Sequence, residues 1–256
     1  MQARFINQIQ NESILVNDQG LIKRGRTLYK ERECIWQAPI DGTVYGTMFN
    51  YKEDLQKVRD EFQKEPYKAL PRHPVLYMKP KNTYNSHLQA IFLPNKVPAI
   101  QINSALGIVI GKTAVNIREE AALNYIMGYT IVHDVTIPHD SFFRPAIKEN
   151  ARDGFCPIGP WIAPKNVIQD VQHLKISTYI NNEKVLDKNT KNFVRSVPRL
   201  LTEVTAFMTL HQGDVLLAGV PLFGPKAKAG DIVRTEIEHI GTLENIVVEE
   251  NGGASL

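Results

Sequence analysis

Residues 105–135 read ALGIVIGKTAVNIREEAALNYIMGYTIVHDV: an apolar run, a Gly-Lys-Thr turn, a polar segment and a second apolar run. The two apolar runs predict buried strands. The second run carries Asp134 near its end. A carboxylate on a buried strand is costly unless a cation pairs with it or a metal coordinates it. Asp134 is therefore a candidate metal ligand, and its partners have to be found elsewhere in the chain.

The composition is that of an ordinary globular protein, with 256 residues, 43% hydrophobic residues, 22% charged residues and a net charge of +3. No concentrated basic run is present, so nucleic acid is not an expected partner. Two cysteines are too few for a disulfide framework or a zinc site. No leader-like segment opens the chain and no apolar run could cross a bilayer, so we expect a cytoplasmic protein without a membrane partner.

Short apolar stretches separated by turn residues dominate the chain. Residues 1–45 predict a small β-rich amino-terminal segment, residues 46–250 the main domain, and residues 251–256 a flexible tail. Helical patterns are few, at 51–64, 118–127 and 198–210, and Asn181-Asn182 predicts a hairpin turn. No glycine-rich phosphate loop joins a strand to a helix. The pattern predicts an α+β fold, mostly β, rather than a doubly wound sheet.

Several motifs follow one another in a recognisable order: Asn50-Tyr51, Lys79-Pro80, LGIVIGKTA at 106–114, GYTIVHDV at 128–135, DGFCPIGPW at 153–161 and IEHIGTLEN at 237–245. With these motifs, residues 45–248 closely resemble the fumarylacetoacetate hydrolase family. The stretch SFFRPAIKE at 141–149 resembles one branch in particular. That branch is the isomerase/decarboxylase of homoprotocatechuate (4-hydroxyphenylacetate) breakdown, of which the chain is most similar to the amino-terminal repeat or subunit.

The resemblance implies a mixed β-roll that dimerises. The two copies of the roll can be two identical chains, two tandem repeats of one chain, or two sister chains. It also implies a divalent metal (Mg, Mn or Ca) that holds the oxygens of a small anionic substrate. Family members ligate this metal with a Glu-x-Glu pair and an aspartate. The aspartate matches Asp134, but the pair matches Asn103 and Ala105. An amide is a weak ligand and a methyl group is none, so we expect a degenerate site with Asp134 and Asn103 as its remaining ligands.

Four further residues are candidates for the site. The family's acid/base dyad matches Asp54 and Lys57, so Asp54 is the catalytic candidate, with a solvated helix residue as the alternative. Lys79 is a candidate for binding a substrate carboxylate, unless it pairs with a local acid. Arg144 has the planar guanidinium that suits a carboxylate, unless it ties its own loop. His139 lies on a loop and is a further candidate for binding the substrate, or an alternative metal ligand.

Two residues near these motifs are not expected to act in the site. His133 should point away from Asp134, because neighbouring residues on a strand face opposite sides. Cys156 should be a buried packing thiol.

The resemblance therefore implies an isomerase/decarboxylase, or a subunit of one, that acts on an anionic oxo- or hydroxy-dienoic acid. Examples are 2-hydroxyhepta-2,4-diene-1,7-dioate and 5-oxopent-3-ene-1,2,5-tricarboxylate, intermediates of aromatic-acid catabolism. The missing glutamates leave an alternative open, a non-catalytic structural subunit or a small-molecule binding protein of the same fold. The expected partners are a small anionic substrate and either a second copy or a sister subunit.

Overall fold

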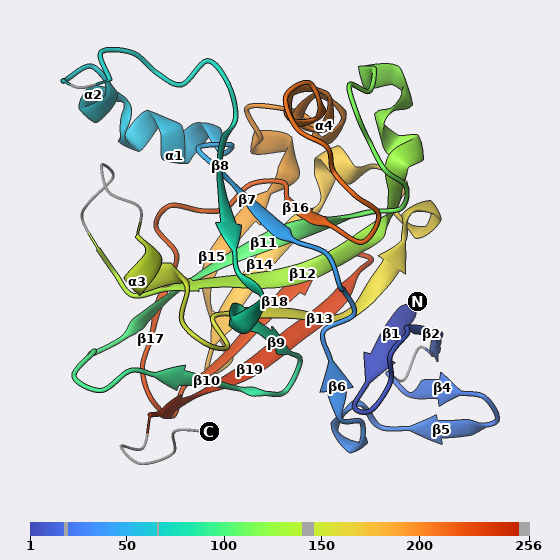
Figure 1. Cartoon of the computed structure of the whole chain (residues 1–256). Helices are drawn as coiled ribbons and strands as arrows, with labels where there is room; N and C mark the ends of the chain where they lie inside the picture. The colour runs from blue at the N-terminus through green and yellow to red at the C-terminus, as the bar shows by residue number, and fades with distance from the viewer. Residues whose placement is uncertain (18–19, 66, 140–145, 251–256) are drawn as a thin grey trace.

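The computed structural model describes residues 1–17, 20–65, 67–139 and 146–250, and strands dominate it (Figure 1). The predicted α+β, mostly β class is confirmed. The large sheet contains β1 (Gln2–Phe5), β2 (Glu12–Ser13), β6 (Trp36–Gln37), β7 (Val44–Met48), β8 (Val75–Lys79), β9 (Tyr84–Ser86), β11 (Ile100–Ile110), β12 (Ile126–Thr136), β13 (Cys156–Pro164), β16 (Val215–Leu217) and β17 (Lys226–Ala227). Its main path runs β2-β1-β13-β12-β11-β16-β7-β8.

Two smaller sheets complete the fold. The first runs β10-β19-β18-β14-β15 and the second β3-β4-β5. Their strands are β10 (Ala90–Leu93), β14 (Lys175–Ile180), β15 (Glu183–Asn189), β18 (Ile232–Ile237), β19 (Gly241–Glu249), β3 (Leu15–Val16), β4 (Ile22–Arg24) and β5 (Thr27–Tyr29). Asn181 and Asn182 join β14 to β15 with φ angles of 51° and 68°, so the predicted hairpin turn is confirmed.

The helices are short and lie at the periphery of the sheets (Figure 1). They are α1 (Lys52–Lys57), α2 (Arg59–Phe62), α3 (Ile147–Asn150) and α4 (Val197–Thr205), with 3₁₀ turns at Glu31–Glu33, Lys81–Thr83, Glu119–Tyr125, Lys165–Val167, Val171–His173 and Thr190–Asn192. In the described part of the chain, no helix has the length and apolar character needed to span a bilayer.

One predicted helix is wrong in type and extent. The helix expected at 118–127 is a 3₁₀ turn that ends at Tyr125, and Ile126 already pairs with Ile110 as the first residue of β12. Strand pairing therefore takes over where the helical pattern was expected to continue, because Ile126 is buried against β11. The helix expected at 198–210 is α4, which begins after Ser196, whose side chain accepts a hydrogen bond from the Arg199 amide.

The central strands β11 and β12 are buried along almost their whole length. On one face, the Ser104 hydroxyl and the His133 ring contact Thr235 of β18 at 2.7 Å and 2.9 Å. Asn103 and Asp134, which pair across the two strands, point to the opposite face. This alternation confirms that His133 points away from Asp134. Beyond β16 the sheet continues with β7 and β8, and Tyr77 and Lys79 of β8 contact Asp134.

The amino-terminal segment does not form one separate sheet. Ala3 of β1 pairs with Trp161 of β13, so β1 extends the large sheet, whereas β3, β4 and β5 form a small sheet of their own. Phe5, Trp36 and Trp161 share an apolar cluster that joins the segment to the main domain.

Candidate functional site

Asp134 lies in β12 at the centre of the candidate site, and its carboxyl group is held by two side chains from β8. The Tyr77 hydroxyl donates a hydrogen bond to Oδ2 at 2.6 Å. Lys79 Nζ lies 2.9 Å from Oδ1. Tyr77 and Lys79 point to the same side because they are two positions apart on one strand. Asp134 is thus paired with a cation and a phenol of the same chain.

Lys79 is fully buried, and its ammonium group is surrounded by oxygen atoms. It forms an ion pair with Asp134 and donates hydrogen bonds to the carbonyl oxygens of Val135 and Asn150 at 2.9 Å and 2.8 Å. Lys79 is therefore paired with an acid, although this acid is Asp134 on another strand and not one close by in the sequence. A contact with a substrate carboxylate would require Lys79 to give up at least one of these oxygens.

Tyr77 fills space beside Asp134. Its ring lies against Gly46 of β7, where an added Cβ atom would come within 2.1 Å of Tyr77 Cζ. Burial, and then the negative charge of Asp134, raise the pKa of the Tyr77 phenol well above its ordinary value. The phenol therefore keeps its proton at neutral pH and acts as a hydrogen-bond donor to the carboxylate.

Asn103 faces Asp134 across the β11–β12 ladder, but its side-chain oxygen is already engaged. Oδ1 accepts hydrogen bonds from Gln101 Nε2 at 2.8 Å and from the Gly224 amide at 3.2 Å. Gln101 Nε2 also donates to the Leu222 carbonyl at 3.0 Å. An added Cβ at Gly224 would lie 2.4 Å from Asn103 Oδ1, so only glycine allows this loop to approach so closely.

Ala105 contributes no polar atom to the centre. It is fully buried in an apolar cluster that includes Val132, its partner across the ladder, and Leu217 and Val220. Tyr77 packs against the same cluster. The position that matches the second family glutamate is thus part of the hydrophobic core.

Asp54 lies in α1 and is only 2% exposed, so its interpretation as a solvated helix residue is wrong. Its Oδ1 accepts a hydrogen bond from Lys188 Nζ at 3.0 Å, and its Oδ2 accepts one from the Leu222 amide at 3.2 Å. Lys188 also contacts Glu53 at 2.9 Å. The helix pattern predicted exposure, but β15 brings a lysine against this face of α1. A role for Asp54 as a base would require it to part from Lys188.

The other predicted residues are less closely connected with the centre. His139 is exposed on the segment after β12. Arg144 lies outside the described residues. Cys156 is fully buried in the same apolar cluster as Ala105, which confirms the packing thiol, and burial raises the pKa of its thiol to about 12.

Four residues of the centre were missed by sequence reasoning. Tyr77 and Gln101 each lie two positions before a predicted site residue on the same strand, so strand alternation could have indicated them. Lys188 and Gly224 carry no such local signal, because they reach the centre only through the tertiary fold.

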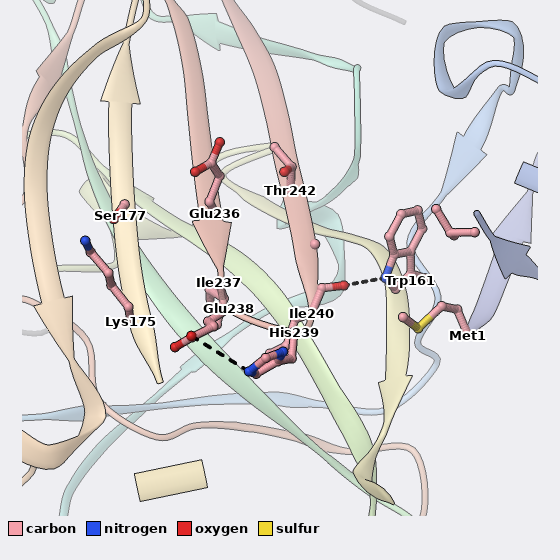
Figure 2. Close-up of a pocket in the computed structure, with 12 residues that line it drawn as sticks. Met1, Trp161, Lys175, Ser177, Glu236, Ile237, Glu238, His239, Ile240 and Thr242 are labelled. Carbon is pink, nitrogen blue, oxygen red and sulfur yellow. Dashed lines mark hydrogen bonds and ion pairs between the residues drawn. The ribbon is translucent and has the colours of Figure 1, made fainter. Parts of the chain in front are cut away.

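An open cleft of about 550 Å³ lies apart from these residues, where the amino-terminal segment meets β14, β18 and β19 (Figure 2). Met1 and Trp161 line one side, Lys175 and Glu236 come from the sheet, and Glu238 comes from the turn after β18. The Trp161 indole is fixed by a hydrogen bond to the Ile240 carbonyl at 2.6 Å. Of the predicted site residues that the structure describes, none lines this cleft.

Comparison with known proteins places the fold. A family model described as fumarylacetoacetate (FAA) hydrolase C-terminal matches residues 43–248, which is most of the chain. The chain belongs to the fumarylacetoacetate hydrolase family. This confirms the resemblance that the motifs indicated.

Among curated members of this family, the 4-hydroxyphenylacetate degradation bifunctional isomerase/decarboxylase of Escherichia coli is 38% identical over 209 residues. The match covers 82% of this chain but 48% of that protein, so the chain spans about half the length of this relative.

Two solved structures share the fold. The 5-carboxymethyl-2-hydroxymuconate delta-isomerase from Mycobacterium smegmatis superposes with a TM-score of 0.80 and 25% identity, covering 97% of this chain and 98% of that one. A maleylpyruvate hydrolase from Sphingobium sp. SYK-6, in complex with manganese (II) ion and pyruvate, has a TM-score of 0.70 and 22% identity over 87% of this chain and 77% of that one.

The residues of this centre do not fit a family-type divalent metal. Hard cations such as Mg²⁺ and Ca²⁺ take about six or more oxygen ligands, with carboxylates among those that the protein supplies. At the three positions that match the family ligands, the Asp134 carboxylate is neutralised by Lys79, the Asn103 oxygen accepts two hydrogen bonds, and the Ala105 side chain has no oxygen. Within the described residues, no three His, Cys, Asp or Glu side chains gather closely enough to hold a metal.

Proposed function

We propose that this chain is a subunit of an isomerase/decarboxylase that acts on an anionic oxo- or hydroxy-dienoic acid of aromatic-acid breakdown. Its substrate is of the type of 2-hydroxyhepta-2,4-diene-1,7-dioate or 5-oxopent-3-ene-1,2,5-tricarboxylate. In this proposal, a sister chain of the same fold that keeps the Glu-x-Glu pair carries the metal-dependent step. This chain completes the assembly and works in the cytoplasm.

The relatives support the reaction class. The Escherichia coli protein is named for both isomerase and decarboxylase activity, and it is 38% identical to most of this chain. Because that protein is about twice as long as the matched region, its activity need not belong to one half alone. A chain of half the length can contribute to the same chemistry as one subunit of a pair.

A single observation supports the division of labour: the Asp134 carboxylate, which matches a family metal ligand, is ion-paired inside the chain. Polarising a substrate carbonyl requires a concentrated positive charge directed at the substrate. The positive charge here, Lys79, is fully buried and directed at Asp134 and two backbone carbonyls. What this chain's residues supply is a rigid, charge-neutral centre, which suits a structural role better than turnover.

The proposal is tested by expressing the chain alone and together with a family member from the same organism that keeps both glutamates. Loss of the dienoate absorbance reports isomerisation, and release of carbon dioxide reports decarboxylation. We expect no turnover by the chain alone, co-elution of the two chains in size-exclusion chromatography, and activity of the pair. A Glu→Gln change in the sister chain should abolish that activity, while Asp134→Asn in this chain should leave residual activity if the pair still assembles.

Two results would count against this proposal. Turnover by the isolated chain with Mg²⁺ or Mn²⁺, lost on Asp134→Asn, would make it an autonomous enzyme. Micromolar binding of the dioate without turnover or association would favour the binding-protein alternative. The cleft of Figure 2 has a volume within the usual range of about 300–1,000 Å³ for ligand pockets, so Trp161→Ala would then be the first variant to test.

A further inference from the structure

We infer that the position matching the family's metal ligands has become a metal-independent joint that fixes the loop at residues 222–225 and helix α1 onto β11. The joint consists of Gln101, Asn103, Leu222, Gly224 and Asp54. This inference concerns the chain's own hydrogen bonds, and it holds whether or not a sister chain exists.

The electrostatics of the centre give the first argument. Asp134 and Lys79 carry opposite charges 2.9 Å apart, and both are nearly or fully buried, so their formal charges cancel. Bringing a dication from water into a buried region costs far more than a neutral centre can return. A metal would therefore find no net attraction here.

The count of free oxygen atoms gives the second argument. Both lone pairs of Asn103 Oδ1 are used, by Gln101 Nε2 and the Gly224 amide. Asp134 Oδ2 accepts the Tyr77 hydroxyl. Asp134 Oδ1 accepts no well-aligned hydrogen bond, but it faces the ammonium of Lys79. A cation that took the Asn103 oxygen as a ligand would have to break contacts that hold the loop.

The same hydrogen bonds form a continuous connection from β11 to α1. Gln101 Nε2 links the Asn103 oxygen to the Leu222 carbonyl, and the Leu222 amide donates to Asp54 of α1. The Ile102 amide adds a backbone bond to the Pro225 carbonyl at 2.9 Å. Amide groups thus do the positioning, and the close approach at Gly224 leaves no room for a side chain.

The connection continues beyond α1. Asp54 Oδ1 is bound by Lys188 of β15, and Lys188 Nζ also lies over the Tyr51 ring, 4.6 Å from its centre. The loop, α1 and the second sheet are therefore tied together without a metal. This predicts that the position of the loop depends on Asn103 and is indifferent to divalent cations.

The test combines a metal titration with hydrogen exchange on the whole chain. Free Mn²⁺ is followed by its electron paramagnetic resonance signal, and amide exchange is followed by mass spectrometry in peptides covering residues 222–225. We expect no binding at millimolar Mn²⁺, and no change in exchange or melting temperature on adding Mn²⁺ or EDTA. Asn103→Ala should accelerate exchange at the Gly224 amide at least several-fold, while the control Asn95→Ala, at an exposed turn, should not.

Restoring the carboxylates gives a second arm. The double variant Asn103→Glu/Ala105→Glu should gain Mn²⁺ binding, and the uncharged control Asn103→Gln/Ala105→Gln should not. Circular dichroism checks that both are folded, and if the glutamate variant does not fold, the wild-type titration and Asn103→Ala decide. The inference is overturned by micromolar Mn²⁺ binding to the wild type that Asp134→Asn abolishes, by EDTA-accelerated exchange at 222–225, or by unchanged exchange in Asn103→Ala.

Discussion

The buried pair of Lys79 and Asp134 should be strongly coupled in the free energy of unfolding. Removing one partner of a buried ion pair typically costs about 3–5 kcal/mol, because the other charge is left uncompensated. We therefore expect Asp134→Asn to cost about 3 kcal/mol. Lys79→Met should cost more, because it also leaves the carbonyls of Val135 and Asn150 without their donor, at about 1 kcal/mol or more each.

The double variant should be less damaging than the sum of the two single variants. Once both charges are absent, no unpaired charge remains, and a methionine fits the apolar surroundings of the lysine stem. A coupling free energy of about 2–3 kcal/mol follows, at the upper end of values for residues in contact. Since domains are stable by roughly 5–15 kcal/mol, each single variant should still be measurable, but with a large loss of stability.

The measurement is urea unfolding of the wild type, Asp134→Asn, Lys79→Met and the double variant. Unfolding is followed by circular dichroism and tryptophan fluorescence and analysed by linear extrapolation at constant m value. High salt should leave the coupling almost unchanged, because buried charges are poorly screened. The exposed pair of Glu61 and Lys64 serves as a matched control and should show no measurable coupling. The reasoning would be refuted if each single variant lost less than about 1 kcal/mol in free energy of unfolding, or if the two losses added up in the double variant.

Three further outcomes are expected. Burial lowers the pKa of His133 from its ordinary value of 6.5 to about 3, so below pH 6.5 the unfolded chain binds a proton at this residue that the folded chain does not. The free energy of unfolding should therefore be unaffected above pH 6.5 and fall as the pH drops toward 3, by about 2 kcal/mol at pH 5. Urea unfolding measures this fall, which should be smaller in His133→Gln. Gly46→Ala should displace the Tyr77 ring and cost about 1–3 kcal/mol, with a changed near-ultraviolet spectrum, whereas an unchanged spectrum would contradict the close contact. Cys156 should resist a thiol reagent at pH 8 until the protein unfolds, since its pKa is raised to about 12; rapid labelling of the native protein would be inconsistent with its burial.

The centre could be predicted only as far as strand alternation and family motifs reach. Alternation correctly placed His133 on the face opposite Asp134, and the motifs correctly indicated that Asn103 lies beside it. The same rule could have found Tyr77, two residues before Lys79. The burial of Asp54 was not predicted, because a short helix pattern does not say which distant strand will cover the helix.

The sequence by itself determined the fold class, the family and the loss of two carboxylates beside Asp134, because apolar periodicity and ordered motifs are local properties of the chain. Only the tertiary structure decided what took their place. The tertiary fold brings β8 to Asp134, so that Tyr77 and Lys79 hold a carboxyl group more than fifty residues away in the chain. Lys188 reaches Asp54 across 134 residues in the same way. Such pairs depend on which strands become neighbours, and no pattern within a single strand carries that information.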